Sequence, residues 1–275
     1  MKKMNYKVLL LSAVLAAAAL AGCSGGSGSS SSAPAAQAPA SQTSSEQSAA
    51  DSPSEASEGA SSKAEESSTP TGEPVDASWF NDAVFVGDSV TLKLSYYADN
   101  GSLGDAQFLC QGSLSYYNAQ WDLDHEDEVH PTIDGVKYQV QDGIAELGSK
   151  KVFVMLGMND IGLNGVDQSI VNMIALTDKI MEKNPGVTLY IESVTPMLVE
   201  SQLSGLNNTS IKEFDEKLKT VCEEKGYHYL DIASAVDDGE GNLVPEYCGD
   251  PDAMGLHFSD EGCDQWVTYL KSHVS

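Results

Sequence analysis

The stretch Ala83-Val84-Phe85-Val86-Gly87-Asp88-Ser89 decides the predicted fold of this chain. Its first four residues are all apolar, which is typical of a β-strand buried on both faces of a parallel sheet. Gly87-Asp88-Ser89 ends this run, and Leu92, Leu94 and Tyr96 then continue in a helical stretch. A strand that passes directly into a helix is the repeating unit of an α/β fold.

Four further apolar runs repeat this pattern toward the C-terminus. They occupy residues 106–110, 151–156, 187–194 and 227–232. The runs are largely continuous rather than alternating, which favours strands covered on both sides over strands with one solvated face. The sequence therefore predicts five strands in one sheet.

Amphipathic helices are predicted between these strands. Residues 167–183 and 208–225 carry apolar side chains at helical spacing, and Gly186 and Gly226 follow the ends of these two segments. The last helix begins at Ser259, a favourable N-cap. We therefore expect a three-layer α/β/α sandwich with a mostly parallel five-stranded sheet. In such a fold, ligands bind beyond the carboxyl ends of the strands.

The N-terminus has the features of an export signal. Lys2, Lys3 and Lys7 precede an apolar run over residues 8–21, which is too short to span a bilayer comfortably. The run ends in Leu-Ala-Gly before Cys23, which resembles a bacterial lipobox. This resemblance implies that residues 1–23 are a lipoprotein signal peptide and that Cys23 carries the lipid, although an ordinary secretory peptide is the alternative. The expected location is the cell membrane of a bacterium, lipid-anchored on its extracellular face.

Residues 24–78 have the composition of a disordered tether. They are mainly Ser, Ala, Gly, Pro, Gln and Glu, and they offer too little apolar surface to offset the entropy of folding. A flexible chain of this length spans roughly 40 Å. Residues 79–275 then form the predicted folded domain.

The charge of the chain excludes one class of partner. Its formal net charge is −26, and all 15 basic residues are Lys. Nucleic-acid binding needs clustered Lys and Arg to replace the counterions of the phosphate backbone. We therefore expect no nucleic-acid partner.

Four sequence islands fall at the predicted strand ends or just before the last helix. They are Gly87-Asp88-Ser89-Val90, Gly112 after the second strand, Gly157-Met158-Asn159-Asp160, and His257-Phe258-Ser259. In order and spacing these islands resemble the SGNH superfamily of GDSL-type esterases. The resemblance covers essentially all of residues 79–275, and it implies the flavodoxin-like fold of SGNH hydrolases.

The residue types in these islands suit ester chemistry. Ser89 at a strand-to-helix turn is the predicted nucleophile, and His257 is the predicted general base. The N–H groups of Ser89 and Gly112, with the side-chain amide of Asn159, would form an oxyanion hole. Each residue also has a structural interpretation: Ser89 as a helix N-cap, Asn159 as a turn cap, and His257 as a core imidazole.

The acid that orients the histidine departs from the family pattern. In the family this acid lies three residues before the histidine, where this chain has Met254. Asp252 and Asp250 are the possible substitutes, and we expect Asp252 to take the role. The alternatives are a Ser89/His257 dyad and a degenerate site, because both acids also suit a solvated turn.

Two other segments carry candidate functional side chains. His125 and His130 are five residues apart, so one helical face would not present both to zinc, and the acidic loop between them is more typical of a solvated segment. Aromatic side chains after Gly112 suit either a sugar subsite or the core edge. These are Tyr116, Tyr117 and Trp121.

Four cysteines remain after Cys23. Cys248 and Cys263 are close enough in sequence to form a disulfide in an exported protein, and the sequence leaves their redox state open. For Cys110 and Cys222, buried free thiols are expected.

These observations together predict a cell-surface serine esterase. Its expected substrate is an acylated carbohydrate or another small ester, and its expected reaction is removal of a short acyl group, acetyl first, through an acyl-enzyme. We expect no cofactor and no metal. The alternatives are an O-acyltransferase of the same fold and a catalytically silent carbohydrate-binding lipoprotein.

Overall fold

A computed structural model describes residues 73–127 and 129–274. The predicted lipidation site at Cys23, the signal peptide and most of the tether lie outside these residues. Val75 packs against the core and its N–H donates to the Lys271 carbonyl at 2.8 Å, and the 3-10 helix η1 begins at Ala77. The folded part therefore starts a few residues before the expected boundary at Trp79.

The predicted sheet is present and all its neighbouring strands are parallel. Its strands are β1 (Ala83–Gly87), β2 (Gln107–Cys110), β5 (Lys151–Met155), β6 (Thr188–Glu192) and β7 (His228–Leu230). They pair in the order β2-β1-β5-β6-β7. The chain order reverses between β1 and β5, and ligands of open α/β sheets bind at such a switch point.

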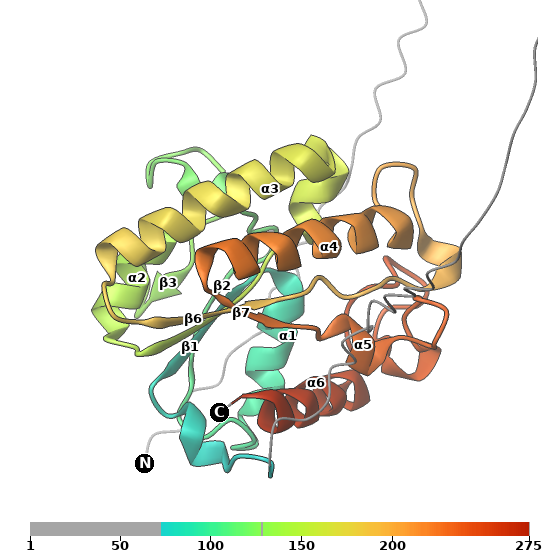
Figure 1. The fold of residues 1–275 in the computed structure, drawn as a ribbon, viewed down its shortest axis with the longest axis horizontal. Helices are drawn as coiled ribbons and strands as arrows, with labels where there is room; N and C mark the ends of the chain where they lie inside the picture. The colour runs from blue at the N-terminus through green and yellow to red at the C-terminus, as the bar shows by residue number, and fades with distance from the viewer. Residues whose placement is uncertain (1–72, 128, 275) are drawn as a thin grey trace, which may run out of the picture. The chain divides into compact units, whose positions relative to one another are not determined.

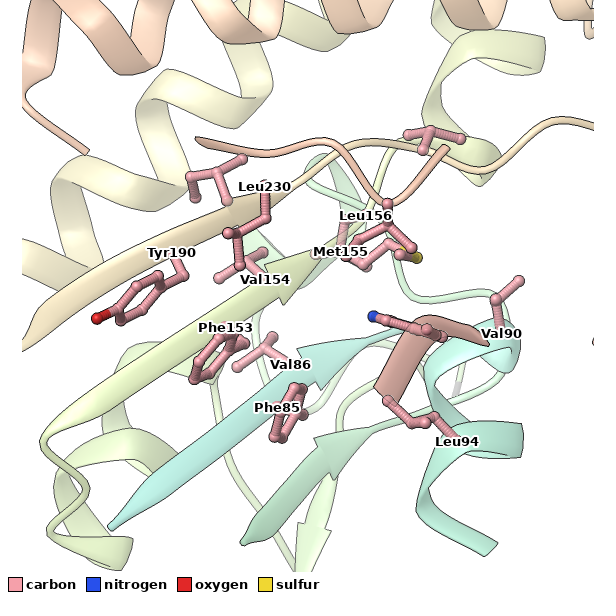
Figure 2. Packing of buried hydrophobic residues seen from close by; sticks show 14 of the residues in the cluster. Phe85, Val86, Val90, Leu94, Phe153, Val154, Met155, Leu156, Tyr190 and Leu230 are labelled. Carbon is pink, nitrogen blue, oxygen red and sulfur yellow. The ribbon is translucent and has the colours of Figure 1, made fainter. Parts of the chain in front are cut away.

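One aromatic row crosses the centre of the sheet. Phe85 of β1 stacks on Phe153 of β5, and Phe153 stacks on Tyr190 of β6, with ring centroids 4.6 Å apart in both pairs. Figure 2 shows these three rings side by side. Phe108 extends the row on β2 and His228 extends it on β7. These five residues are paired in register on neighbouring strands, so their stacked rings stabilise the alignment of all five strands.

Helices cover both faces of the sheet, so the expected three-layer fold is confirmed. In Figure 1, α2, α3 and α4 lie on one face, while α1 and α6 lie on the other. Their bounds are α1 (Ser89–Ala98), α2 (Val140–Leu147), α3 (Met158–Lys183), α4 (Asn208–Lys225) and α6 (Asp260–His273). No helix in the part of the chain that the structure describes is both long and apolar enough to cross a membrane.

Helix α3 is longer than its apolar pattern indicated. It begins at Met158 rather than at Asp167, and it contains a kink at Gly165, where φ is 73°. The pattern found only the part after this kink. The earlier turn carries Asn159, so the kink separates the end of α3 that carries Asn159 from the longer part of the helix.

Several short elements were not predicted from the sequence. These are α2, the four-residue helix α5 (Ala233–Val236), the hairpin of β3 (Thr132–Ile133) and β4 (Val136–Lys137), and the 3-10 turns η1 (Ala77–Phe80), η2 (Asn118–Gln120), η3 (Val199–Ser201) and η4 (Pro245–Tyr247). Apart from α2, each has five residues or fewer, which is too short to show a hydrophobic period.

Candidate active site

The serine lies where β1 passes into α1. Asp88, rather than Ser89, is the N-cap of this helix, since its Oδ1 accepts the Val90 N–H at 2.9 Å. The Ser89 hydroxyl is therefore not needed to cap the helix. Its Oγ lies 2.8 Å from Nε2 of His257. The geometry thus favours the predicted role of Ser89 over its structural interpretation.

Gly87 makes this sharp turn possible. A Cβ atom at this position would lie 1.9 Å from Thr91 Oγ1 and 2.8 Å from the Met155 carbonyl oxygen. Both distances are shorter than any real carbon contact. Only glycine therefore lets α1 pack this close to the ends of β1 and β5.

His257 lies on a loop whose two ends are joined by backbone hydrogen bonds. Cys248 and Phe258 form an isolated antiparallel bridge, and the Gly249 N–H donates to the His257 carbonyl at 2.7 Å. Ser259 then caps α6, accepting the Gly262 N–H. This confirms the predicted start of the last helix. The imidazole is held by the loop and is not a core side chain, because 27% of its surface is exposed.

Asp250 is the acid beside His257, and this corrects the expectation for Asp252. Oδ2 of Asp250 lies 2.7 Å from His257 Nδ1. Its Oδ1 accepts the backbone N–H groups of His257 and Leu256, both at 3.0 Å. The loop wraps around this one carboxylate, whereas Asp252 lies exposed in the turn over residues 251–254.

The loop keeps Asp250 ionised. Burial alone would raise its pKa, but the hydrogen bonds from the His257 ring and backbone outweigh burial and hold the pKa below its ordinary value. Met254, three residues before His257, has an exposed side chain that cannot serve as the acid. The acid therefore comes from seven residues before the histidine instead of three.

Asn159 joins the same edge of the sheet from the first turn of α3. Its Nδ2 lies 3.0 Å from Asp88 Oδ2 and 3.1 Å from the Leu114 carbonyl oxygen. Gly157 allows this approach, since a Cβ there would lie 2.7 Å from Val194 and 2.8 Å from the Phe214 ring. The structure thus ties the Asn159 amide to the serine turn and to the loop after β2.

Gly112 lies in that loop. Gly87 of β1 is in register with Cys110 of β2, so Ser89 and Gly112 each follow this pair by two residues. The Gln111 N–H donates to the Gly87 carbonyl at 3.1 Å, which holds the two chain segments together. A Cβ at Gly112 would meet no atom within 4 Å, so open space adjoins this backbone.

Sequence reasoning missed two carboxylates that build the site. Asp88 links the serine turn to Asn159, and burial raises its pKa to about 6. Asp160 accepts the N–H groups of Tyr116 at 2.8 Å and Tyr117 at 3.0 Å, and burial raises its pKa to about 7. Asp88 carried a usable signal, since Asp directly before a helix is a preferred N-cap. The partners of Asp160 are non-local and left no signal.

The aromatic residues after Gly112 differ in burial. Tyr116 is fully buried beside Phe214 and belongs to the core, whereas Tyr117 and Trp121 form an edge-to-face pair nearer the surface. The His125 ring stacks on Trp121. Among residues 73–127 and 129–274, no three His, Cys, Asp or Glu side chains gather as metal ligands.

All four cysteines after Cys23 are free thiols in the structure. Cys222, Cys248 and Cys263 are buried, and Cys110 is partly buried. Burial raises the pKa of Cys110 to about 11 and that of Cys222 to about 12, so both stay protonated near neutral pH. The open question of a Cys248–Cys263 disulfide is answered here by two separate thiols.

Solved structures with this fold come from several bacteria. A structure from Desulfitobacterium hafniense, described as a lipolytic protein of the G-D-S-L family, is 18% identical to this chain. The match has a TM-score of 0.52 and covers 70% of this chain and 98% of that one. A GDSL-like lipase from Bacteroides thetaiotaomicron is 13% identical, with a TM-score of 0.50, covering 73% and 89%. At these identities the likeness shows the fold alone. A search of curated proteins gave no match.

The sequence itself carries the family assignment. Residues 85–265 match the model of the GDSL-like lipase/acylhydrolase family. This range is more than half of the chain and includes Ser89, Gly112, Asn159, Asp250 and His257. The chain belongs to the GDSL-like lipase/acylhydrolase family, a family of ester hydrolases.

Proposed function

We propose that this protein is a serine esterase that cleaves carboxylic esters through an acyl-enzyme. One observation carries the proposal: Asp250, His257 and Ser89 form a continuous hydrogen-bonded chain, with contacts of 2.7 Å and 2.8 Å. This is the arrangement by which a histidine activates a serine hydroxyl and an acid orients the histidine.

The reaction follows from these contacts in two halves. Ser89 Oγ attacks the ester carbonyl carbon while His257 Nε2 takes the hydroxyl proton. The carbonyl oxygen becomes negative and is stabilised by the N–H groups of Ser89 and Gly112 and by the Asn159 amide. The C–O bond to the alcohol then breaks, and His257 returns its proton to the leaving oxygen. Water, deprotonated by His257, attacks the acyl-serine and releases the acid and Ser89.

The substrate proposed is a short acyl ester, acetyl first, on a carbohydrate at the cell surface. The argument for the place is the lipobox before Cys23 and the polar tether of residues 24–78. Labelling with a fatty-acid probe tests the anchor: wild type should take up label and Cys23→Ala should not. Release of acetate from acetylated polysaccharides, compared with p-nitrophenyl acetate, tests the substrate class.

Replacing the nucleophile should have the largest effect of any change in the chain. Ser89→Ala should lower p-nitrophenyl acetate hydrolysis by about 10⁴-fold or more, because no other hydroxyl replaces the attacking oxygen. Ser95→Ala is the matched control, since Ser95 lies in the same helix and its Oγ donates to the Leu92 carbonyl rather than to His257. Equal turnover by wild type and Ser89→Ala would refute the enzyme and leave a binding protein.

A further inference from the structure

Asp88 has two hydrogen-bonding duties at the active site. Its Oδ1 accepts the Val90 N–H at 2.9 Å, and its Oδ2 accepts the Asn159 amide at 3.0 Å. Only 2% of its surface is exposed. A carboxylate is the smallest side-chain group that offers one acceptor oxygen to each of two donors. Asp88 therefore joins the helix that begins with the proposed nucleophile to the residue proposed as an oxyanion donor.

The two acceptors of the Asn159 amide differ in strength. One is the Asp88 carboxylate and the other is the neutral carbonyl of Leu114. Hydrogen bonds to ionised acceptors are roughly twice as strong as neutral ones. An oxyanion on the substrate would therefore replace Leu114, while the bond to Asp88 remains and fixes the orientation of the amide.

We infer that Asp88 is a positioning residue that holds the Asn159 amide ready for the oxyanion. The inference rests on the proposed esterase function. It assigns to Asp88 a task in the transition state, distinct from its task as the cap of α1. Without this carboxylate, Asn159 can turn toward Leu114 or solvent, and the oxyanion loses a pre-oriented donor.

Charged and titratable groups surround Asp88 on several sides. His257 attracts the carboxylate electrostatically, Asp160 lies close enough to feel its charge, and Cys110 feels it from β2. The strongest influence on its pKa is burial, which raises it. The pH profile of the enzyme would therefore mix several groups, so the sharper test is a double-mutant cycle at one pH.

The cycle combines Asp88→Asn with Asn159→Ala in the full-length protein. Asparagine has one acceptor oxygen, so it can cap Val90 but then presents an amide donor to Asn159. We expect Asp88→Asn to lower kcat roughly 10- to 100-fold with KM changed by less than about threefold. In the Asn159→Ala background the same change should lower kcat by less than about threefold, because the group it positions is gone.

Two further variants keep the result interpretable. Asp88→Ser also retains a cap acceptor but cannot reach Asn159, so its loss of kcat should equal that of Asp88→Asn. If one of the two variants folds poorly, the other carries the test. Asp82→Asn is the matched control, since Asp82 is exposed at the opposite end of β1 and pairs with Lys151. It should leave kcat unchanged in both backgrounds.

The outcomes separate this inference from the proposed function. If the losses of kcat from Asp88→Asn and Asn159→Ala multiply in the double variant, or if only KM rises, then Asp88 does not act through Asn159. In that case an inactive Ser89→Ala variant still supports the proposed esterase function. If Ser89→Ala is fully active, the esterase fails and this inference fails with it.

Discussion

Two carboxylates flank the Ser89–His257 pair, and their surroundings differ. Asp88 lies on the serine turn, almost fully buried, and accepts one backbone N–H and one side-chain amide. Asp250 lies on the histidine loop, partly exposed, and accepts two backbone N–H groups near 3.0 Å besides the imidazole. Burial dominates at Asp88 and raises its pKa to about 6, whereas hydrogen bonding dominates at Asp250 and lowers its pKa.

This difference shows how one site uses two kinds of acid. A carboxylate with a lowered pKa stays negative over the whole neutral range, as is needed to stabilise the imidazolium that forms during acyl transfer. The Asp88 carboxylate, buried on the serine turn, instead holds the Asn159 amide in place. The histidine loop therefore supplies charge, and the serine turn supplies geometry.

Removing the charge on the histidine loop should lower activity more than any change on the serine turn other than loss of Ser89 itself. Asp250→Asn should lower kcat/KM by about 10³- to 10⁴-fold, because the asparagine amide favours the wrong tautomer of His257 and cannot stabilise its cation. Asp252→Asn is the matched control two residues away and should retain the wild-type rate. Steady-state hydrolysis of p-nitrophenyl acetate measures both.

The reverse result would break the comparison. If Asp252→Asn lost activity and Asp250→Asn did not, the loop would adopt another path in solution. If neither variant lost activity, the site would be a Ser89/His257 dyad. Circular dichroism should confirm that both proteins keep their helices, since Asp250 also accepts bonds from the loop backbone.

Removing the amide on the serine side should have an intermediate effect. Asn159→Ala should lower kcat by roughly 10²- to 10³-fold and leave KM almost unchanged, because the amide is needed mainly when the carbonyl oxygen becomes charged. Kinetics over a range of substrate concentrations separate the two parameters. A change confined to KM would place Asn159 in ground-state binding instead.

The sequence predicted the serine side of the site better than the histidine side. Ser89 and Asn159 follow strands whose apolar runs are continuous, so strand ends fixed their positions within a residue or two. His257 was found from its island just before the last helix, which resembles the histidine block of the SGNH superfamily in order and spacing. Asp250 was named as a candidate acid, but Asp252 was preferred to it. The choice depends on how the loop folds back, and the bridge from Cys248 to Phe258 that closes this loop has no sequence signal.

The fold followed the same rule. The five strands and the long helices have periodic or continuous patterns, and all were predicted. The start of α3 was missed because Gly162 and Gly165 interrupt its apolar pattern, although the turn before the kink carries Asn159. Sequence patterns thus described the scaffold, while the contacts that complete the site are tertiary.

The smallest effect on turnover is expected for Glu192, a third buried carboxylate that sharpens the comparison because it lies outside the site. It ends β6 and accepts the Trp266 indole N–H at 3.1 Å. Burial raises its pKa to about 8, and the bond from Trp266 only partly opposes this. The folded protein therefore holds a proton here that the unfolded chain, with an ordinary pKa, has released at neutral pH.

The sign of the pH effect follows from this difference. The stability contributed by protonated Glu192 is fully present below the unfolded pKa and is lost as the pH rises toward about 8. Glu192→Gln keeps an acceptor for Trp266 and cannot ionise, so its Tm should exceed that of wild type by several degrees at pH 8 and by much less at pH 5. The exposed Glu182→Gln should show no such dependence. An equal Tm difference at both pH values would mean that Glu192 is ionised in the folded protein, and burial would then not decide the state of these carboxylates.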